Sequence, residues 1–159
     1  MKHKHIITLH YYKLAMQKFM IYTDGASRSN PGESAAGYVI FKDGIEIARN
    51  AVYIGKQTNN YAEYTAVINA LLWCKENLND LKNCDIELYS DSEVIIKQLN
   101  SHYKVRSEKL FEMNAKAKEV ARSFAHIKFA NLPRENEHIS EVDLMLNCLL
   151  DRVLGKKST

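Results

Sequence analysis

Hydrophobic positions alternate with polar ones, or recur at helical spacing, along most of the chain after residue 18. Short runs rich in aromatic and β-branched residues predict strands at residues 19–23, 37–42, 45–54, 85–90 and 126–132. Apolar residues three and four positions apart predict helices at residues 60–77, 92–99, 107–124 and from about 140 to 153. Residues 26–34, which contain an Asn-Pro-Gly sequence, are expected to form a loop.

The order of these elements predicts the fold class. Asp43-Gly44 is the two-residue signal of a type I′ hairpin, so the first three strands should form an antiparallel meander. The later strands alternate with helices, and such crossovers usually join parallel strands. We therefore expect an α/β domain with a five-stranded mixed sheet, three antiparallel strands followed by parallel ones, and helices on both faces.

The length and composition fit a single domain. The chain has 159 residues, 46% of them hydrophobic, which is enough for one core. We expect residues 1–18 to be a poorly ordered amino-terminal extension, residues 19–154 to be the domain, and residues 155–159 to be a tail. The apolar run at residues 6–9 is too short to span a membrane, and no cleavage site of a secretory signal follows it.

Charge and cysteine usage give weak information about binding partners and about the cellular compartment. A net charge of +3 and a pI near 8.7 permit an anionic partner without requiring one. Three cysteines lack metal-ligand spacing, and Cys74 and Cys148 lie in apolar helical stretches. This pattern indicates buried thiols in a reducing compartment, so we expect a cytoplasmic protein.

Four carboxylates carry most of the chemical information. Asp24 and Asp91 follow the first and fourth predicted strands, while Glu63 and Asp143 fall in the first turns of two predicted helices. Taken singly, each has a structural explanation, as a turn residue, a helix cap or a partner of the helix macrodipole. Taken together, they converge, because the ends of parallel neighbouring strands meet at one sheet edge, where open α/β sheets place ligands.

Small residues favour this convergence. Ala62, Ala66 and Ala70 should let the helix at residues 60–77 approach the sheet closely and bring Glu63 over the strand ends. Acids that gather without matching cations repel one another, and this cost is normally tolerated where divalent metal binds. Two divalent ions suit phosphodiester hydrolysis, because they lower the pKa of an attacking water and support the leaving oxygen. The pattern therefore indicates a metal-dependent enzyme acting on a phosphate backbone.

From about residue 19 to residue 150, an ordered set of segments resembles type 1 ribonuclease H. The segments are Tyr-Thr-Asp-Gly-Ala-Ser at 22–27, Asn-Pro-Gly at 30–32, Asn-Asn-Tyr-Ala-Glu-Tyr at 59–64, Leu-Tyr-Ser-Asp-Ser-Glu at 88–93, Lys-Gln-Leu-Asn at 97–100, Pro-Arg-Glu-Asn at 133–136 and Val-Asp at 142–143. The chain is most similar to the compact bacterial and archaeal branch. It has no room between Leu99 and Lys109 for the basic substrate handle of other members, and residues 1–18 do not resemble their hybrid-binding module.

The resemblance implies a ribonuclease H-like fold and an endoribonuclease that cuts the RNA strand of RNA–DNA hybrids, leaving 5′-phosphate and 3′-hydroxyl ends. It implies two Mg²⁺ ions per site, with Mn²⁺ as a substitute. Asp24 would bridge both ions, Asp143 would complete the nucleophile side, and Glu63 and Asp91 would hold the leaving-group side. We expect a monomer without an obligatory protein partner and without membrane attachment.

The resemblance also implies substrate contacts. Amides and carboxylates can hydrogen-bond the 2′-hydroxyl that marks RNA, and the positions that match such contacts are Asn30, Asn59, Asn60 and Glu93. Ser27 and Ser92 are further substrate-binding candidates, and Arg28 is a candidate for phosphate contact. Asn30 has the alternative role of serving only its turn.

One departure concerns the last acid. The family usually places it about seven residues after the Arg of Pro-Arg-Glu, whereas Asp143 lies nine residues after Arg134 and Glu141 stands at the usual distance. The apolar pattern of the last helix favours Asp143 as the ligand, with Glu141 as the alternative. Arg134 and His138, which is expected on the preceding loop, both qualify as catalytic residues that assist proton transfer or product release.

The basic residues near the second predicted helix have two interpretations, a phosphate-binding rim and an ordinary solvated surface: Lys97, His102, Lys104, Arg106 and Lys109. Tyr61 and Tyr64 are expected in the core rather than as base-stacking platforms.

Two alternative functions stay open, a two-metal nuclease that also cuts double-stranded RNA and a catalytically silent hybrid-binding domain. The complete set of acids argues against the silent domain, because a binding module gains nothing from negative charge near phosphates.

Overall fold

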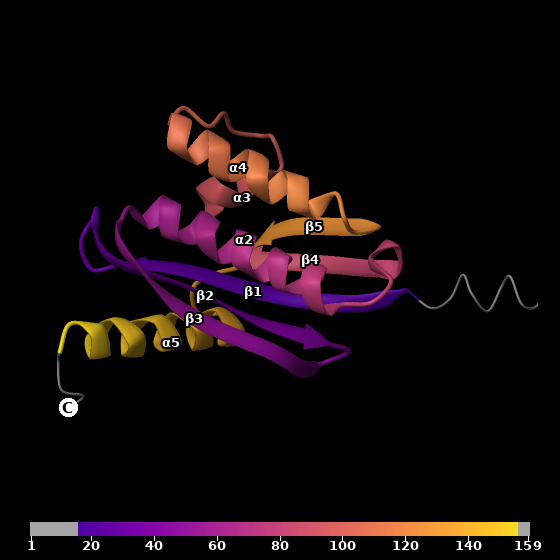
Figure 1. The fold of residues 1–159 in the computed structure, drawn as a ribbon, viewed down its shortest axis with the longest axis horizontal. Helices are drawn as coiled ribbons and strands as arrows, with labels where there is room; N and C mark the ends of the chain where they lie inside the picture. The colour runs from indigo at the N-terminus through magenta and orange to yellow at the C-terminus, as the bar shows by residue number, and fades with distance from the viewer. Residues whose placement is uncertain (1–15, 156–159) are drawn as a thin grey trace, which may run out of the picture.

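The computed structural model describes residues 16–155, which form one five-stranded sheet covered by helices on both faces (Figure 1). The strands are β1 (Gln17–Ser27), β2 (Gly32–Lys42), β3 (Ile45–Gln57), β4 (Cys84–Ser90) and β5 (His126–Asn131). Their order in the sheet is β3-β2-β1-β4-β5. β1, β2 and β3 pair antiparallel, whereas β4 pairs parallel with β1 and with β5. The predicted mixed sheet is thus confirmed.

The β2–β3 connection is the predicted tight turn. Asp43 and Gly44 both have positive φ, 50° and 79°, as the two central residues of a type I′ turn require. Because this turn matches the twist of the flanking strands, it starts an edge hairpin that runs the full length of the sheet.

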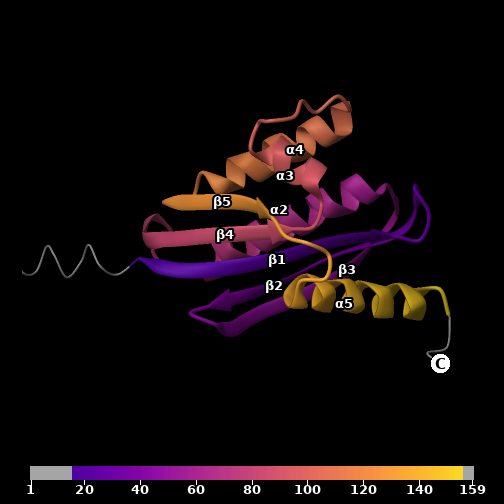
Figure 2. The same ribbon diagram turned by 180° about the vertical axis from the view of Figure 1, so that it is seen from behind.

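Within residues 16–155, four α-helices cover the sheet in two unequal layers. α2 (Asn59–Asn77), α3 (Glu93–Leu99) and α4 (Glu108–Ala121) lie on one face, and α5 (Glu137–Val153) lies alone on the other (Figures 1 and 2). Each helix starts at a side-chain cap, from Thr58, Ser92, Ser107 and Asn136 respectively. A short 3₁₀ turn, η1 (Leu81–Asn83), precedes β4. No helix among residues 16–155 is long and apolar enough to cross a membrane.

The sheet separates two hydrophobic cores. The larger core packs α2, α3 and α4 against the sheet and includes the fully buried Phe19, Ile86 and Leu71. The smaller core packs α5 against β1 and β2 through Val142, Leu146 and other apolar residues of the helix. Gly37 makes this second contact close, because a Cβ there would lie 2.7 Å from Leu146 Cδ2. The two helical layers are therefore held by separate sets of contacts.

Several predicted boundaries are wrong. β1 continues to Ser27 and β2 begins at Gly32, so the predicted loop at residues 26–34 shrinks to a few residues. The Ser- and Gly-rich sequence favours a loop, but its small side chains pair across an antiparallel ladder, with Ala26 opposite Ala35. β3 likewise runs on to Gln57. Consequently, Asp24 lies inside a strand and not at its carboxyl end.

The ends of the chain and one cysteine also need correction. Gln17 and Lys18 belong to β1 rather than to an extension, and the rest of the expectation for residues 1–15 lies outside the described residues, as does the tail from 156. α5 begins at Glu137, because Asn136 caps it by accepting hydrogen bonds from the N–H groups of His138 and Ile139. Cys74 is buried as predicted, but Cys148 is exposed on the outer side of α5.

Candidate active site

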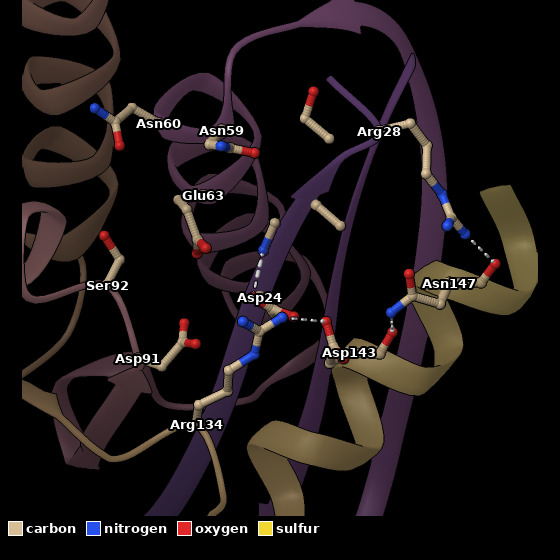
Figure 3. A pocket seen from close by; sticks show the side chains of 13 residues that line it. Asp24, Arg28, Asn59, Asn60, Glu63, Asp91, Ser92, Arg134, Asp143 and Asn147 are labelled. Atoms are coloured by element: carbon tan, nitrogen blue, oxygen red, sulfur yellow. Dashed lines mark hydrogen bonds and ion pairs between the residues drawn. The ribbon is translucent and has the colours of Figure 1, made fainter. Parts of the chain in front are cut away.

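Three carboxylates from three elements meet at one point of the molecule. Asp24 comes from β1, Glu63 from α2, and Asp91 from the residue that follows β4. One carboxylate oxygen from each acid lies within 4.8 Å of an oxygen of the other two. The side chains of Asp24 and Glu63 are buried, at 5% and 8% exposure, while that of Asp91 is half-buried. The predicted convergence of these three acids is seen in the structure (Figure 3).

The fourth acid, Asp143, reaches the same place from the opposite helical layer. It lies in the second turn of α5, not in the first turn, and its side chain points toward Asp24 (Figure 3). Glu63 is likewise in the second turn of α2. The macrodipole explanation of these two acids therefore fails, because that effect falls off within the first turn. The site therefore collects acids from both faces of the sheet.

A glycine explains how closely α2 approaches β1. A Cβ on Gly25 would lie 2.3 Å from the backbone nitrogen of Glu63, and 2.4 Å from the carbonyl carbon of Ala62. The predicted small face of the helix is also present, since Ala62, Ala66 and Ala70 are fully buried. The absence of a side chain at Gly25 thus allows the backbone of α2 to rest on the strand and places Glu63 beside Asp24.

Burial and mutual repulsion raise the pKa values of the clustered acids. Burial, the charges of Asp91 and Asp143, and a hydrogen bond with Asp143 raise the pKa of Asp24 to about 8. Burial and the charges of Asp24 and Asp91 raise the pKa of Glu63 well above its ordinary value. Burial also raises the pKa of Asp91, although the Arg134 guanidinium partly opposes this. Without a cation, the cluster retains protons that a free carboxylate would release.

The donor set fits a hard divalent cation. Carboxylate oxygens are the ligands that Mg²⁺ and Mn²⁺ prefer, and a bound cation offsets the repulsion that raises these pKa values. Protein donors offset little of this negative charge: Glu63 accepts from the Ser90 hydroxyl at 3.4 Å and from the N–H of Gly25, and that N–H also donates to Asp24 at 3.0 Å. The cluster is therefore suited to metal rather than to a protein cation.

The acids open into a polar pocket of about 540 Å³. Four of the six predicted substrate-binding residues line it: Ser27, Asn59, Asn60 and Ser92. Two of these have structural duties as well, because the Ser92 hydroxyl caps α3 and the Ser27 hydroxyl donates to the Gln57 carbonyl at 3.1 Å. The amide side chains of Asn59 and Asn60 lie on the α2 side of the pocket (Figure 3).

Asn30 and Glu93 lie outside this pocket. The Asn30 side chain accepts a hydrogen bond from the N–H of Asn59 at 3.0 Å, which ties the β1–β2 turn to the start of α2. Asn30 also lines a second hollow of about 320 Å³, together with Asn60, Tyr61 and Lys109. Glu93 is paired with Lys97 at 2.5 Å on the surface of α3. Both predictions of substrate contact remain untested.

Arg134 and His138 occupy different surroundings. Arg134 lines the pocket, with its guanidinium 3.8 Å from Asp143 and its side chain 72% exposed. His138 is not on a loop, as expected, but in the first turn of α5. Its ring packs against Tyr22 and Phe41, at centroid distances of 4.6 Å and 4.4 Å, and it does not line the pocket. The position of His138 thus gives no support to a catalytic role.

Glu141, the alternative to Asp143, also lies outside the pocket. Its carboxylate pairs with the guanidinium of Arg49 on β3, and Arg49 bonds Glu46 as well. Because successive residues of a helix are turned about 100° apart, Glu141 and Asp143 leave α5 in different directions. The geometry favours Asp143 as the fourth acid.

The basic residues divide into paired and free groups. Lys97 binds Glu93 and the Tyr103 hydroxyl, and Lys109 lies 4.2 Å from the Tyr61 ring centre while donating to Gln57. The three others are exposed on the turn between α3 and α4: His102, Lys104 and Arg106. α4 follows α3 with no further helix between them, in agreement with the prediction that this region lacks a basic substrate handle.

Sequence reasoning missed Asn147 of the pocket wall and the structural partners of Arg28. Asn147 lies one helical turn beyond Asp143, and its side chain donates to the Asp143 carbonyl at 2.9 Å. Arg28, considered only for phosphate contact, donates instead to α5, to the Asn147 carbonyl at 3.0 Å and to Asp151 at 2.7 Å. The four-residue spacing of Asp143, Asn147 and Asp151 was the available signal, since it puts all three on one face of a helix.

The fold and the acid pocket define an α/β domain with a carboxylate cluster for divalent metal, and comparison with known proteins agrees. The profile of the RNase H family matches residues 16–140. Ribonuclease HI of Halobacterium salinarum is 37% identical over 131 residues, which are 82% of this chain and 63% of that protein. The chain belongs to the RNase H family.

Solved structures give the same result. The crystal structure of RNase H1 from Halobacterium salinarum has a TM-score of 0.78 and 34% identity, and covers 85% of this chain and 98% of that one. LC11-RNase H1 in complex with an RNA/DNA hybrid has a TM-score of 0.76 and 35% identity, and covers 86% and 99%. The predicted family and fold are confirmed. The chain spans less than two thirds of the length of the first curated relatives it matches, 63% and 32%.

Proposed function

We propose that this protein is an endoribonuclease that hydrolyses the RNA strand of RNA–DNA hybrids with two Mg²⁺ ions and leaves 5′-phosphate and 3′-hydroxyl ends. The observation that carries the proposal is the meeting of Asp24, Glu63 and Asp91 within 4.8 Å, with Asp143 beside them, in an open polar pocket. A similar structure, that of LC11-RNase H1, is described in complex with an RNA/DNA hybrid.

The four acids would each bind one or both of the two metal ions. Asp24 stands at the centre of the cluster, so it is the residue that both ions would share, with Asp143 completing one site and Glu63 and Asp91 the other. When bound, the ions would lower the pKa of an attacking water and support the leaving oxygen. Mn²⁺ is expected to substitute, because it prefers the same oxygen ligands.

The remaining residues of the pocket bind and orient the substrate. Asn59 and Asn60 present amide groups on the α2 side, where they can donate to or accept from a 2′-hydroxyl and so distinguish RNA from DNA. Arg134 projects from the opposite rim, and its exposed guanidinium can contact a phosphate without being displaced from a buried partner. We assign Arg134, and not His138, the role of assisting product release.

Cleavage of an end-labelled RNA–DNA hybrid tests the proposal. The hybrid is compared with double-stranded RNA and double-stranded DNA of the same sequence, in Mg²⁺, in Mn²⁺ and in EDTA. We expect metal-dependent cutting confined to the RNA of the hybrid. Asp91→Asn should reduce it by a factor on the order of 10³, because the amide keeps the shape but removes a ligand charge. A hybrid that survives in both metals contradicts the proposal, and equal cutting of double-stranded RNA supports the broader nuclease instead.

A further inference from the structure

Arg28 joins the end of β1 to the carboxyl-terminal half of α5. It directly follows the last residue of β1, and its Nη2 donates both to the Asn147 carbonyl at 3.0 Å and to the Asp151 carboxylate at 2.7 Å. The two ends of this contact are 123 residues apart in the chain. Figure 3 shows the Arg28 side chain pointing away from the acids and toward α5.

The contact falls on the same face of α5 that carries the fourth acid. Asp143, Asn147 and Asp151 recur every four residues and therefore lie along one stripe of the helix. Along this stripe, the Asn147 side chain donates to the Asp143 carbonyl at 2.9 Å, and Arg28 binds the next two members. The stripe thus runs from the acid cluster at one end to Arg28 at the other.

The acid cluster places like charges between α5 and β1. Asp143 of α5 lines the same pocket as the buried Asp24 of β1, and its side chain points toward Asp24, so the two carboxylates repel each other. Arg134 opposes this only weakly, because its contact with Asp143 is 3.8 Å long and its side chain is 72% exposed. Arg28 provides a second cation beside the same stripe, and its Nη2 donates to a carbonyl and a carboxylate together.

We propose that Arg28 is a positioning residue, which holds Asp143 against Asp24 by binding the Asn147 carbonyl and the Asp151 carboxylate. This inference rests on the proposed metal-dependent nuclease function. It differs from the expectation that Arg28 contacts substrate phosphates, because the partners of its guanidinium in the structure belong to α5. Asp151 is the distinguishing residue, since it lies outside the pocket.

Arg49 provides a matched control on the same helix. Its guanidinium also ties α5 to the sheet, by binding Glu141, but Glu141 lies outside the pocket. Removing either arginine takes away one ion pair that ties α5 to the rest of the domain, from the turn after β1 for Arg28 and from β3 for Arg49. Only the loss of Arg28 acts on the stripe that contains Asp143, so a difference between the two variants isolates the positioning effect from general anchoring of the helix.

The test measures Mn²⁺ binding by isothermal titration calorimetry in the absence of substrate, beside kcat and KM for hybrid cleavage at limiting and saturating metal. We expect Arg28→Met and Asp151→Asn each to weaken Mn²⁺ binding about fivefold and to lower kcat at limiting metal, with KM for the hybrid changed less than about twofold. Saturating metal should restore much of kcat. Arg49→Met should bind Mn²⁺ within about twofold of the unmodified protein.

Exchanging the charges of Arg28 and Asp151 tests whether a restored ion pair also restores Mn²⁺ binding. Arg28→Asp combined with Asp151→Arg keeps both charges, and we expect it to bind Mn²⁺ more tightly than Arg28→Asp alone. The proposal is overturned if Arg28→Met raises KM while Asp151→Asn has no effect, since that pattern shows phosphate contact. It is also overturned if Arg49→Met weakens Mn²⁺ binding as much. An unmodified protein that neither binds Mn²⁺ nor cleaves the hybrid contradicts the proposed function instead.

Discussion

Consecutive residues of α2 enter two buried polar clusters of opposite character. Tyr64 points into the larger core, where its hydroxyl donates to Gln98 at 2.8 Å and accepts from Asn114 at 3.0 Å. Glu63 points to the sheet edge, where its nearest polar neighbours include Asp24 and Asp91. In the first cluster the Tyr64 hydroxyl and the Asn114 amide each donate to an acceptor, and in the second almost every side chain offers only acceptors.

This difference shows that the cluster around Tyr64 stabilises the fold, whereas the acid cluster destabilises it. The cluster around Tyr64 links α2, α3 and α4 and satisfies its buried polar groups, as cores generally do. The acid cluster has raised pKa values because its members are buried and repel one another. Such a cluster reduces stability in the metal-free protein, and it persists because the surrounding backbone positions it and because a cation can relieve it.

Among the substitutions that test this difference between the two clusters, Gly25→Ala should have the largest effect on stability and activity. The new Cβ would lie 2.3 Å from the backbone nitrogen of Glu63, so α2 has to move away from β1. We expect a loss of about 3 kcal/mol in the free energy of unfolding, because backbone yields less readily than a side chain, and a loss of metal-dependent cleavage. Chemical denaturation and the hybrid assay measure the two effects. Unchanged activity would show that the close approach of α2 is not needed.

Tyr64→Phe should affect stability without affecting the site. Removing the hydroxyl leaves the buried Gln98 and Asn114 without one of their partners, which should cost about 2 kcal/mol. The activity per folded molecule should stay within about twofold, even though Glu63 is the adjacent residue. Urea denaturation monitored by circular dichroism gives the first quantity. A large fall in kcat at full folding would show that the two clusters are coupled.

The smallest predicted effect is a pH dependence of the metal-free protein. The pKa of Asp24 is raised from 3.8 to about 8 by folding, so between these values the folded state binds more protons than the unfolded state. Stability should therefore fall as the pH rises from 7 to 8 in EDTA, by on the order of 1 kcal/mol. Carboxyls with lowered pKa values, such as Glu46 and Glu87, act below this window.

Thermal denaturation at the two pH values checks this dependence. Asp24→Asn should flatten the slope and make the metal-free protein more stable at pH 8, although it removes activity, and Mg²⁺ should reduce the slope of the unmodified protein. A slope that Asp24→Asn leaves unchanged would assign the effect to other groups.

Sequence reasoning predicted the sheet and the four acids because both depend on short-range patterns. The hairpin at Asp43-Gly44, the apolar stripe of α2 and the acids placed after strands can all be recognised within a few residues. The reach of β1 through Ala26 and Ser27 could not be recognised in this way, because small polar residues favour loops until a neighbouring strand pairs with them.

Contacts between segments that are distant in the chain could not be predicted from the sequence. The sequence around His138 favours a loop because it does not make the cap at Asn136 evident, and only the fold shows the ring of His138 packed against Tyr22 and Phe41. The partners of Arg28 lie more than a hundred residues away, so no local pattern indicates them. The close fit at Gly25 is of the same kind, since it depends on the backbone of α2.

The separation of the two hydrophobic cores has a consequence for how the protein can lose activity. Asp143 is carried by α5, a helix of 17 residues on its own side of the sheet, while Glu63 is carried by the larger layer on the other side. Detaching α5 would open only the smaller core, which makes it a candidate unit of local unfolding. Amide hydrogen exchange would report such opening in α5 at a lower free energy than in α2. The molecule can then be folded by most measures and still lack a complete active site.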